Sequence, residues 1–163
     1  MLGASGAPRA ALADAMEKKD SAAVRALLGD SDVNLAQADG MTALHWAVLH
    51  DDLEAARALL AAKANPGAEN RYGVSPLSLA CTNGNAAMVT LLLDAGADSN
   101  GPLRGGETPL MTAARTGELG SVEVLIARGA VVDARLENGQ TALMWAAADG
   151  HTAVVKALLA AGA

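Results

Sequence analysis

The chain has 163 residues, enough for one ordinary domain, and a formal net charge of -6. Hydrophobic residues make up 52% of it and aromatic residues only 2%, with no Phe, so the core must be built from Ala, Leu, Val and Met. The acidic balance argues against binding of nucleic acid, which requires a basic surface. A single cysteine excludes an intrachain disulfide framework and a multi-cysteine metal site.

The N-terminus lacks the charged start and apolar run of a secretory signal. The chain also has no uninterrupted apolar stretch of about 18 residues, so we predict no membrane insertion. The compartment stays unknown: the cytoplasm is the default, and a signal peptide removed beforehand is the alternative. The high content of Ala, Gly and Arg indicates a GC-rich bacterial source.

The first helices are expected at 11–16 and 22–28, with the hydroxyl of Ser21 capping the second. The next unit begins with Thr42-Ala43-Leu44-His45-Trp46-Ala47, in which Thr42 is the expected helix cap. Its helices are expected at 43–49 and 53–61, and Asp51-Asp52 separates them. Acidic residues at a helix N-terminus interact favourably with the helix dipole.

The segment at Thr42 recurs at Ser75, Thr108 and Thr141, so its four copies begin at equal intervals along the chain. A fixed period of about 33 residues is typical of stacked repeat proteins. In the third unit Ser75-Pro76 begins a helix, since proline is favoured at the first helical position, and a second helix follows at 86–94. A glycine lies two residues before each cap, which indicates a turn with positive φ; these are Gly40, Gly73, Gly106 and Gly139.

The first unit, about 8–41, is an imperfect copy of the repeat. Its Leu27-Leu28 lies one position closer to Leu59-Leu60 than the period requires, and it carries extra charge at Glu17, Lys18, Lys19, Asp20 and Arg25. Terminal repeats need a polar outer face, so we interpret it as the N-terminal cap. The last unit, 141–163, resembles an interior copy. We therefore expect either a longer array or self-association through this uncapped C-terminal repeat.

These units resemble ankyrin repeats. The resemblance rests on Thr42-Ala43-Leu44-His45, Thr108-Pro109-Leu110, Gly150-His151, Val154-Val155, Leu158-Leu159 and Gly162-Ala163. It implies an all-α solenoid of stacked antiparallel helix pairs with β-hairpin-like loops at a right angle. The chain then forms a single domain, 1–163, with the cap at 8–41, internal repeats at 42–74, 75–107 and 108–140, and a truncated final repeat at 141–163. The His45 position departs from the family pattern in the other units, which have Ser78, Met111 and Met144.

One repeat alone buries too little surface to be stable, so the repeats must stack. We expect Leu44, Leu77, Leu110 and Leu143 to line one interior row. A second row should comprise Leu59-Leu60, Leu92-Leu93, Leu125-Ile126 and Leu158-Leu159.

The residues that carry reactive groups receive structural interpretations. Cys81 takes the place of Ala114 and Ala147, which indicates a buried residue. The resemblance implies a structural role for His45, and His151 is expected at a helix start. The three histidines lack a metal-ligand spacing, and Trp46 and Trp145 are expected to pack in the core or line a groove. We predict no cofactor, no metal and no catalysis.

The resemblance implies that partners bind to loop tips and to the concave face of the first helices. Mapped by register, the expected protein-binding residues are Asp39, Met41, Leu49, His50, Arg71, Tyr72, Val74, Thr82, Asn83, Arg104, Glu107, Arg115, Thr116, Glu137, Asn138, Gln140 and Asp149. These positions vary between copies while the scaffold positions do not. Three arginines in this set, Arg71, Arg104 and Arg115, suggest an acidic epitope on an unidentified protein partner. The alternatives are a targeting or regulatory arm of a larger enzyme and a passive structural spacer.

Overall fold

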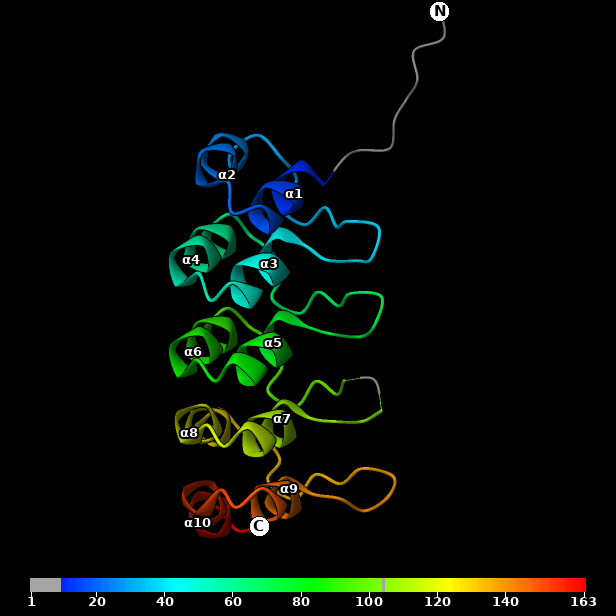
Figure 1. Ribbon diagram of the computed structural model, residues 1–163, viewed down its shortest axis with the longest axis vertical. Helices are drawn as coiled ribbons and strands as arrows, with labels where there is room; N and C mark the ends of the chain where they lie inside the picture. Colours follow the sequence, from blue (N-terminus) through cyan, green and yellow to red (C-terminus); the bar gives the residue numbers. More distant parts are fainter. Residues whose placement is uncertain (1–9, 104) are drawn as a thin grey trace, which may run out of the picture.

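The computed structural model describes residues 10–103 and 105–163, and these contain ten helices and no strand. The helices are α1 (Ala11–Glu17), α2 (Ser21–Leu27), α3 (Ala43–Leu49), α4 (Leu53–Ala61), α5 (Pro76–Asn83), α6 (Ala86–Asp94), α7 (Pro109–Thr116), α8 (Leu119–Ala127), α9 (Ala142–Ala148) and α10 (Thr152–Ala160). Figure 1 shows the odd-numbered helices in one column, the even-numbered helices in a second column, and the connecting loops projecting to the side. The chain is an all-α repeat solenoid, as predicted.

Short-range hydrogen bonds fix where α3, α5, α7 and α9 begin. The hydroxyls of Thr42, Ser75, Thr108 and Thr141 each accept a hydrogen bond from the backbone N–H three residues on, at 3.3–3.4 Å. In α5 and α7 a proline follows the cap, where its missing N–H costs nothing. The predicted caps at the start of these helices are therefore confirmed.

The helices α2, α4 and α6 use a different cap, whereas α8 and α10 have no side-chain cap. The side chains of Asp20, Asp52 and Asn85 accept hydrogen bonds from the backbone N–H groups of Ala23, Ala55 and Met88. The prediction that Ser21 caps α2 was wrong, because the carboxylate of the preceding Asp20 takes that place. The cap lies one residue earlier than predicted, and α2 spans Ser21–Leu27 instead of the predicted 22–28.

The loops between helix pairs turn back on themselves at the predicted glycines. Gly40, Gly73, Gly106 and Gly139 have φ values of 87°, 74°, 83° and 81°, a region that L side chains rarely adopt. At Gly40 a Cβ would also lie 2.9 Å from the backbone nitrogen of Arg71 in the next loop. Glycine is required there both for the turn and for the close approach of the two loops.

The first predicted leucine row is fully buried only in the inner units. Leu44, Leu77 and Leu110 are buried, whereas Leu143 is half-buried because no further helix pair covers it in this structure. In the second row the first member of each pair is fully buried: Leu59, Leu92, Leu125 and Leu158. The second members Leu60, Leu93 and Ile126 are half-buried, and Leu159 is 54% exposed. The prediction that both members line the interior was thus wrong for Leu159.

A groove of about 610 Å³ separates α2 from α4. Val24 and Leu28 line it from one side and Ala55 and Ala58 from the other. The positions of these alanines hold the larger Met88 and Leu91 in α6, one repeat later, so small side chains on α4 leave the space unfilled. The groove thus coincides with small residues at these two positions of α4.

Two asparagines connect successive repeats on the loop side. Asn34 Nδ2 donates to the carbonyl oxygen of Lys63 (3.1 Å), and its Oδ1 accepts from the N–H of Asn65 (2.7 Å). Asn100 makes the same two bonds, to Gly129 (3.0 Å) and Val131 (2.8 Å). Each side chain therefore bridges two repeats by satisfying a carbonyl and an N–H that follow a helix end.

Candidate binding surface

The expected residues from the first helices lie at the C-terminal ends of α3, α5, α7 and α9. Leu49 is 42% exposed, and Thr82, Asn83, Arg115 and Asp149 are exposed as well. His50 and Thr116 are half-buried. Because the helices stack in register, these ends form one continuous strip along the solenoid.

The loop tips contribute a second strip. Arg71, Tyr72, Glu137, Asn138 and Gln140 are exposed, and Tyr72 stands out with 60% of its surface accessible. Asp39, Val74 and Glu107 are half-buried, and Arg104 lies outside the described residues.

Met41 does not belong to the exposed strip. It is only 8% exposed, and Asn70 Nδ2 in the next loop lies 3.4 Å from its sulfur. Its place directly before the helix cap Thr42 turns the side chain inward against the following repeat. The expectation that Met41 presents a side chain to a partner was therefore wrong.

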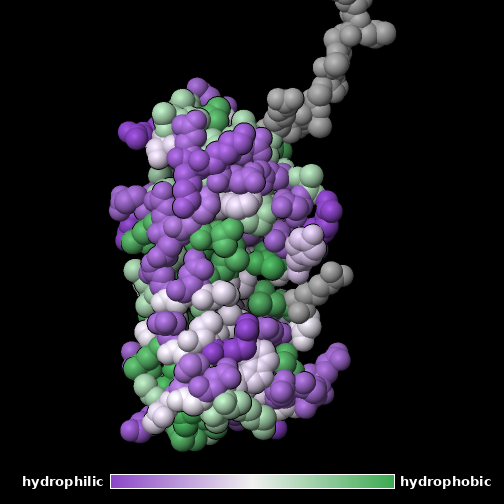
Figure 2. Space-filling model, viewed as in Figure 1, coloured by the Kyte–Doolittle hydropathy of each residue, from purple (hydrophilic) through white to green (hydrophobic). Residues whose placement is uncertain are grey.

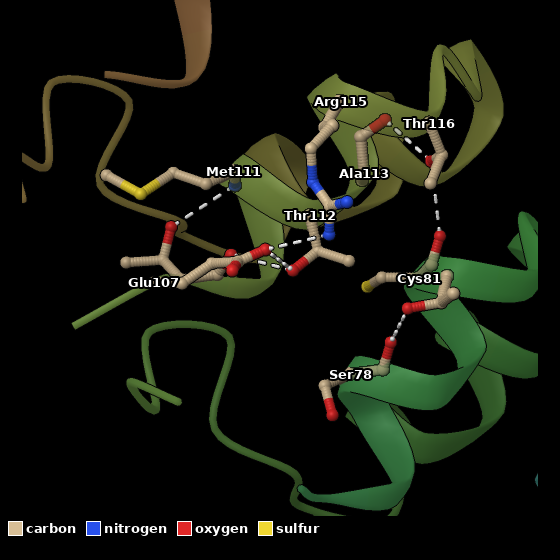
Figure 3. Close-up of polar contacts among 10 residues, drawn as sticks. Ser78, Cys81, Glu107, Met111, Thr112, Ala113, Arg115 and Thr116 are labelled. Carbon is tan, nitrogen blue, oxygen red and sulfur yellow. Dashed lines mark hydrogen bonds and ion pairs between the residues drawn. The ribbon is translucent and has the colours of Figure 1, made fainter. Parts of the chain in front are cut away.

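Several polar members of the predicted set bind neighbouring repeats. Asn83 Nδ2 donates to the carbonyl oxygen of Val48 at 2.8 Å. The hydroxyl of Thr116 donates to the carbonyls of Cys81 (3.3 Å) and Ala113 (3.0 Å), as Figure 3 shows. These side chains connect successive first helices, a role that register mapping alone does not distinguish from partner contact.

Arg115 lies at the centre of a polar cluster on the fourth repeat. Its Nη2 lies 3.3 Å from Glu107 Oε1, and the hydroxyl of Thr112 donates to the same oxygen at 2.7 Å (Figure 3). The guanidinium also stands 5.5 Å from the ring centroid of Trp145, within range of a cation–π contact. Residues from a loop, from α7 and from α9 thus hold the guanidinium in place.

Arg71 is held by the preceding loop. Its side chain donates to the carbonyl oxygen of Ala38, and its backbone N–H donates to the carbonyl of Asp39 at 2.8 Å. Both arginines of the set that the structure describes therefore have intramolecular partners.

Two tryptophans lie beside this strip although the predicted set omits them. Trp46 and Trp145 are half-buried at the equivalent position of α3 and α9, and Trp46 Nε1 donates to Gln37 Oε1 at 2.7 Å. Their shared register position was the signal in the sequence, but register alone left core packing and groove lining open. Figure 2 shows the molecule from the same side as Figure 1. Hydrophilic residues cover most of the upper end, where α1 and α2 lie, and hydrophobic residues gather in the middle.

Cys81 is fully buried, and burial raises the pKa of its thiol to about 12. A thiol in this state is protonated and unreactive at neutral pH. The structural interpretation of Cys81 is confirmed.

His45 is buried within its own cap. Its Nδ1 accepts from the Thr42 N–H (3.2 Å), and Nε2 lies 3.0 Å from the carbonyl oxygen of Val74, which assigns the ring proton to Nε2. Burial lowers the pKa of His45. His151 precedes α10, its ring contacts Gly117, and its Nε2 lies 2.9 Å from the Arg115 carbonyl oxygen. Both histidines therefore act within the scaffold, as predicted.

Within the described residues, no group of three or more His, Cys, Asp and Glu side chains gathers in a way that would hold a metal ion. In the same part of the chain, no helix has the length and apolar character needed to cross a membrane.

The described part of the chain thus consists of stacked helix pairs with threonine and serine caps and positive-φ glycines in the loops. A family model described as ankyrin repeats (3 copies) matches residues 12–102 and again residues 99–163. The chain belongs to the ankyrin repeat family. Ankyrin repeats generally serve as protein-interaction modules and are typically not catalytic. The two strips, of loop tips and of first-helix ends, are accordingly the candidate surface of this ankyrin protein.

Proposed function

We propose that this ankyrin repeat chain binds a protein partner along the two strips formed by its loop tips and by its first-helix ends, without catalysis of its own. The main support is the exposure of two large apolar side chains there: Tyr72 (60%) and Leu49 (42%). Both belong to the unit 42–74, with Leu49 at the end of α3 and Tyr72 at the loop tip, and apolar surface of this kind can be buried against a partner. Tyrosine is also enriched among residues that dominate binding energy.

The intramolecular contacts of Arg115 and Arg71 bear on the chemistry of the proposed partner. The charge of Arg115 is partly compensated because it pairs with Glu107, whereas Arg71 donates to the neutral Ala38 carbonyl and keeps its charge. We therefore propose a partner segment with apolar or aromatic side chains that cover Tyr72 and Leu49, with polar groups toward the Arg115 cluster.

The proposed repeat units are 8–41, 42–74, 75–107, 108–140 and 141–163, one for each of the five helix pairs. Self-association through the last unit is a separate proposal. It is supported by the exposure of Met144 (53%) and Leu159 (54%), whereas Met111, at the position of Met144 in the preceding unit, is buried. Light scattering tests it: mass that rises with concentration supports it, and a concentration-independent monomer refutes it.

Binding can be tested with a triple variant, Leu49→Ala, Tyr72→Ala and Arg115→Ala. A matched control replaces Arg57, Glu123 and Val131 by alanine, which are exposed outside the two strips. Proteins captured from a lysate of the source cell by the parent chain and by the control, but lost from the triple variant, would support the proposal.

Capture that persists in the triple variant would refute the proposed surface. No selective capture by the parent chain would favour the passive spacer. Far-UV circular dichroism of all three proteins ensures that loss of binding does not reflect loss of the fold.

A further inference from the structure

Three Asn-Gly pairs occur in the chain: Asn83-Gly84, Asn100-Gly101 and Asn138-Gly139. In such a pair the backbone nitrogen of glycine can attack the Cγ carbon of the asparagine side chain. A C–N bond forms and ammonia leaves, which produces a cyclic succinimide. Water then opens the ring at either carbonyl to give aspartate or isoaspartate. Glycine favours the reaction because its backbone reaches conformations closed to other residues.

The structure distinguishes the three asparagines by what holds their side chains. Asn83, the last residue of α5, donates to the Val48 carbonyl in the preceding repeat at 2.8 Å. Asn100 bridges to Gly129 and Val131 in the following repeat. To approach the glycine nitrogen, either side chain must first release bonds that connect two repeats.

Asn138 has no such connection among the described residues. It is exposed at a loop tip, where its Nδ2 donates to Gln140 Oε1 (3.0 Å) and its Oδ1 accepts from the Gln140 N–H (3.1 Å). Both partners belong to the same exposed loop, so water can replace these bonds at little net cost.

The glycine nitrogens do not differ in this way. The N–H of Gly84 donates to the carbonyls of Ala80 (3.0 Å) and Cys81 (3.3 Å). The N–H groups of Gly101 and Gly139 each donate to one backbone carbonyl, at 3.2 and 2.8 Å. This bond must open at every site, and it therefore cannot favour Asn100 or Asn83 by more than a small factor. The bonds between repeats remain as the main difference.

We propose that Asn138 is a site of spontaneous deamidation in the folded protein, and that the stacking of repeats protects Asn83 and Asn100. The product places a new negative charge beside Glu137, and in the isoaspartate form it adds a methylene group to the backbone of the loop. The modification does not depend on the proposed function.

Purified protein is incubated in mildly alkaline buffer, sampled over time, digested and analysed by mass spectrometry, with enzymatic carboxyl methylation to detect isoaspartate. In the folded protein Asn138 should convert about fivefold faster than Asn83 or Asn100, the factor expected when hydrogen bonds worth about 1 kcal/mol must break first. In urea-unfolded protein the three sites should convert at similar rates, since each is then an Asn-Gly pair in a flexible chain.

Conversion of Asn138 no faster than the other two in the folded protein would overturn the proposal. A preference for Asn138 that is equally strong in unfolded protein would also overturn it, because local sequence rather than stacking would then decide. The variant Asn138→Gln should abolish the fast release of ammonia and leave the slow phase unchanged; persistence of the fast release would refute Asn138 as its source.

Discussion

Gly67 occupies the position at which Asn34 and Asn100 bridge two repeats, so this bridge is missing from its own repeat. It lies midway along the chain between Asn34 and Asn100, the two residues that connect their own repeats to the next. By the same offsets of 29 and 31 residues, an asparagine at 67 would donate to the Gly96 carbonyl and accept from the Asp98 N–H. Among the described residues neither of those two groups makes a hydrogen bond. We predict that Gly67→Asn stabilises the protein.

The backbone at Gly67 already has the geometry of the other two sites. Its N–H donates to the side chain two residues earlier, Asn65 Oδ1 (3.0 Å), as the N–H groups of Asn34 and Asn100 donate to Asp32 and Asp98. Its φ lies outside the left-handed region, and an added Cβ would meet only Asn65 Oδ1, at 3.6 Å. The new side chain therefore introduces no clash and no backbone strain.

The gain has two parts. Replacing glycine at a compatible site contributes about 0.4–1 kcal/mol by restricting the unfolded chain. Two exposed hydrogen bonds add roughly 0.5 kcal/mol each, the lower end of their usual range. The sum is about 1–2 kcal/mol, or roughly 2–8 °C in the melting temperature of a chain of this size.

Urea unfolding followed by far-UV circular dichroism measures this gain. The matched control is Gly67→Ala, which restricts the unfolded chain without forming the bridge. The converse variant Asn100→Gly should lose a comparable amount. If Gly67→Asn proves no more stable than Gly67→Ala, the bridge does not form and the reasoning is refuted.

Three further predictions concern the core and its polar groups. Leu77→Ala removes a side chain that is only 2% exposed and should lower the free energy of unfolding by about 2–5 kcal/mol. Leu159 is 54% exposed, so Leu159→Ala should lower it by less than about 1 kcal/mol. Equal losses for the two variants in urea unfolding would contradict the assigned core. Ser121→Ala removes a fully buried hydroxyl that has no hydrogen-bond partner in the described structure, so it should gain about 1–3 kcal/mol, and a loss of stability would show that the hydroxyl is satisfied. Burial lowers the pKa of His45 below its usual 6.5, so the unfolded chain binds the proton more readily. The stability contributed by neutral His45 should be complete above pH 6.5 and decline as the pH falls toward the lowered pKa, and His45→Ser should remove this decline; urea titrations across that range in which both proteins decline alike would contradict it.

The boundaries of α3, α4 and α6 could be read from the sequence because the bonds that set them are local. The predicted ranges 43–49, 53–61 and 86–94 coincide with α3, α4 and α6. The hydroxyl of Thr42 reaches an N–H only three residues away, and a glycine such as Gly73 makes its turn through its own φ. The constant repeat period then indicates where each local signal recurs, so the repeat architecture followed as well.

The tertiary structure decided which exposed positions are free. Arg115 is paired because Glu107, from the loop before α7, and Trp145, from the next repeat, reach it in space. Met41 is buried because the following loop covers it. Register assigns a residue to a position in the repeat, but it does not say what the neighbouring repeat places against that position.

The groove between α2 and α4 and the asparagine bridges have the same origin. Both depend on side-chain size and polarity in two repeats at once: Ala55 against α2, or Asn34 against the backbone after α4. The sequence by itself thus determined the repeat unit, its caps and its turns, because those are formed within a few residues. Only the stacked structure decided which leucines are covered and which polar groups stay accessible, because that depends on contacts between residues that lie a whole repeat apart in the chain.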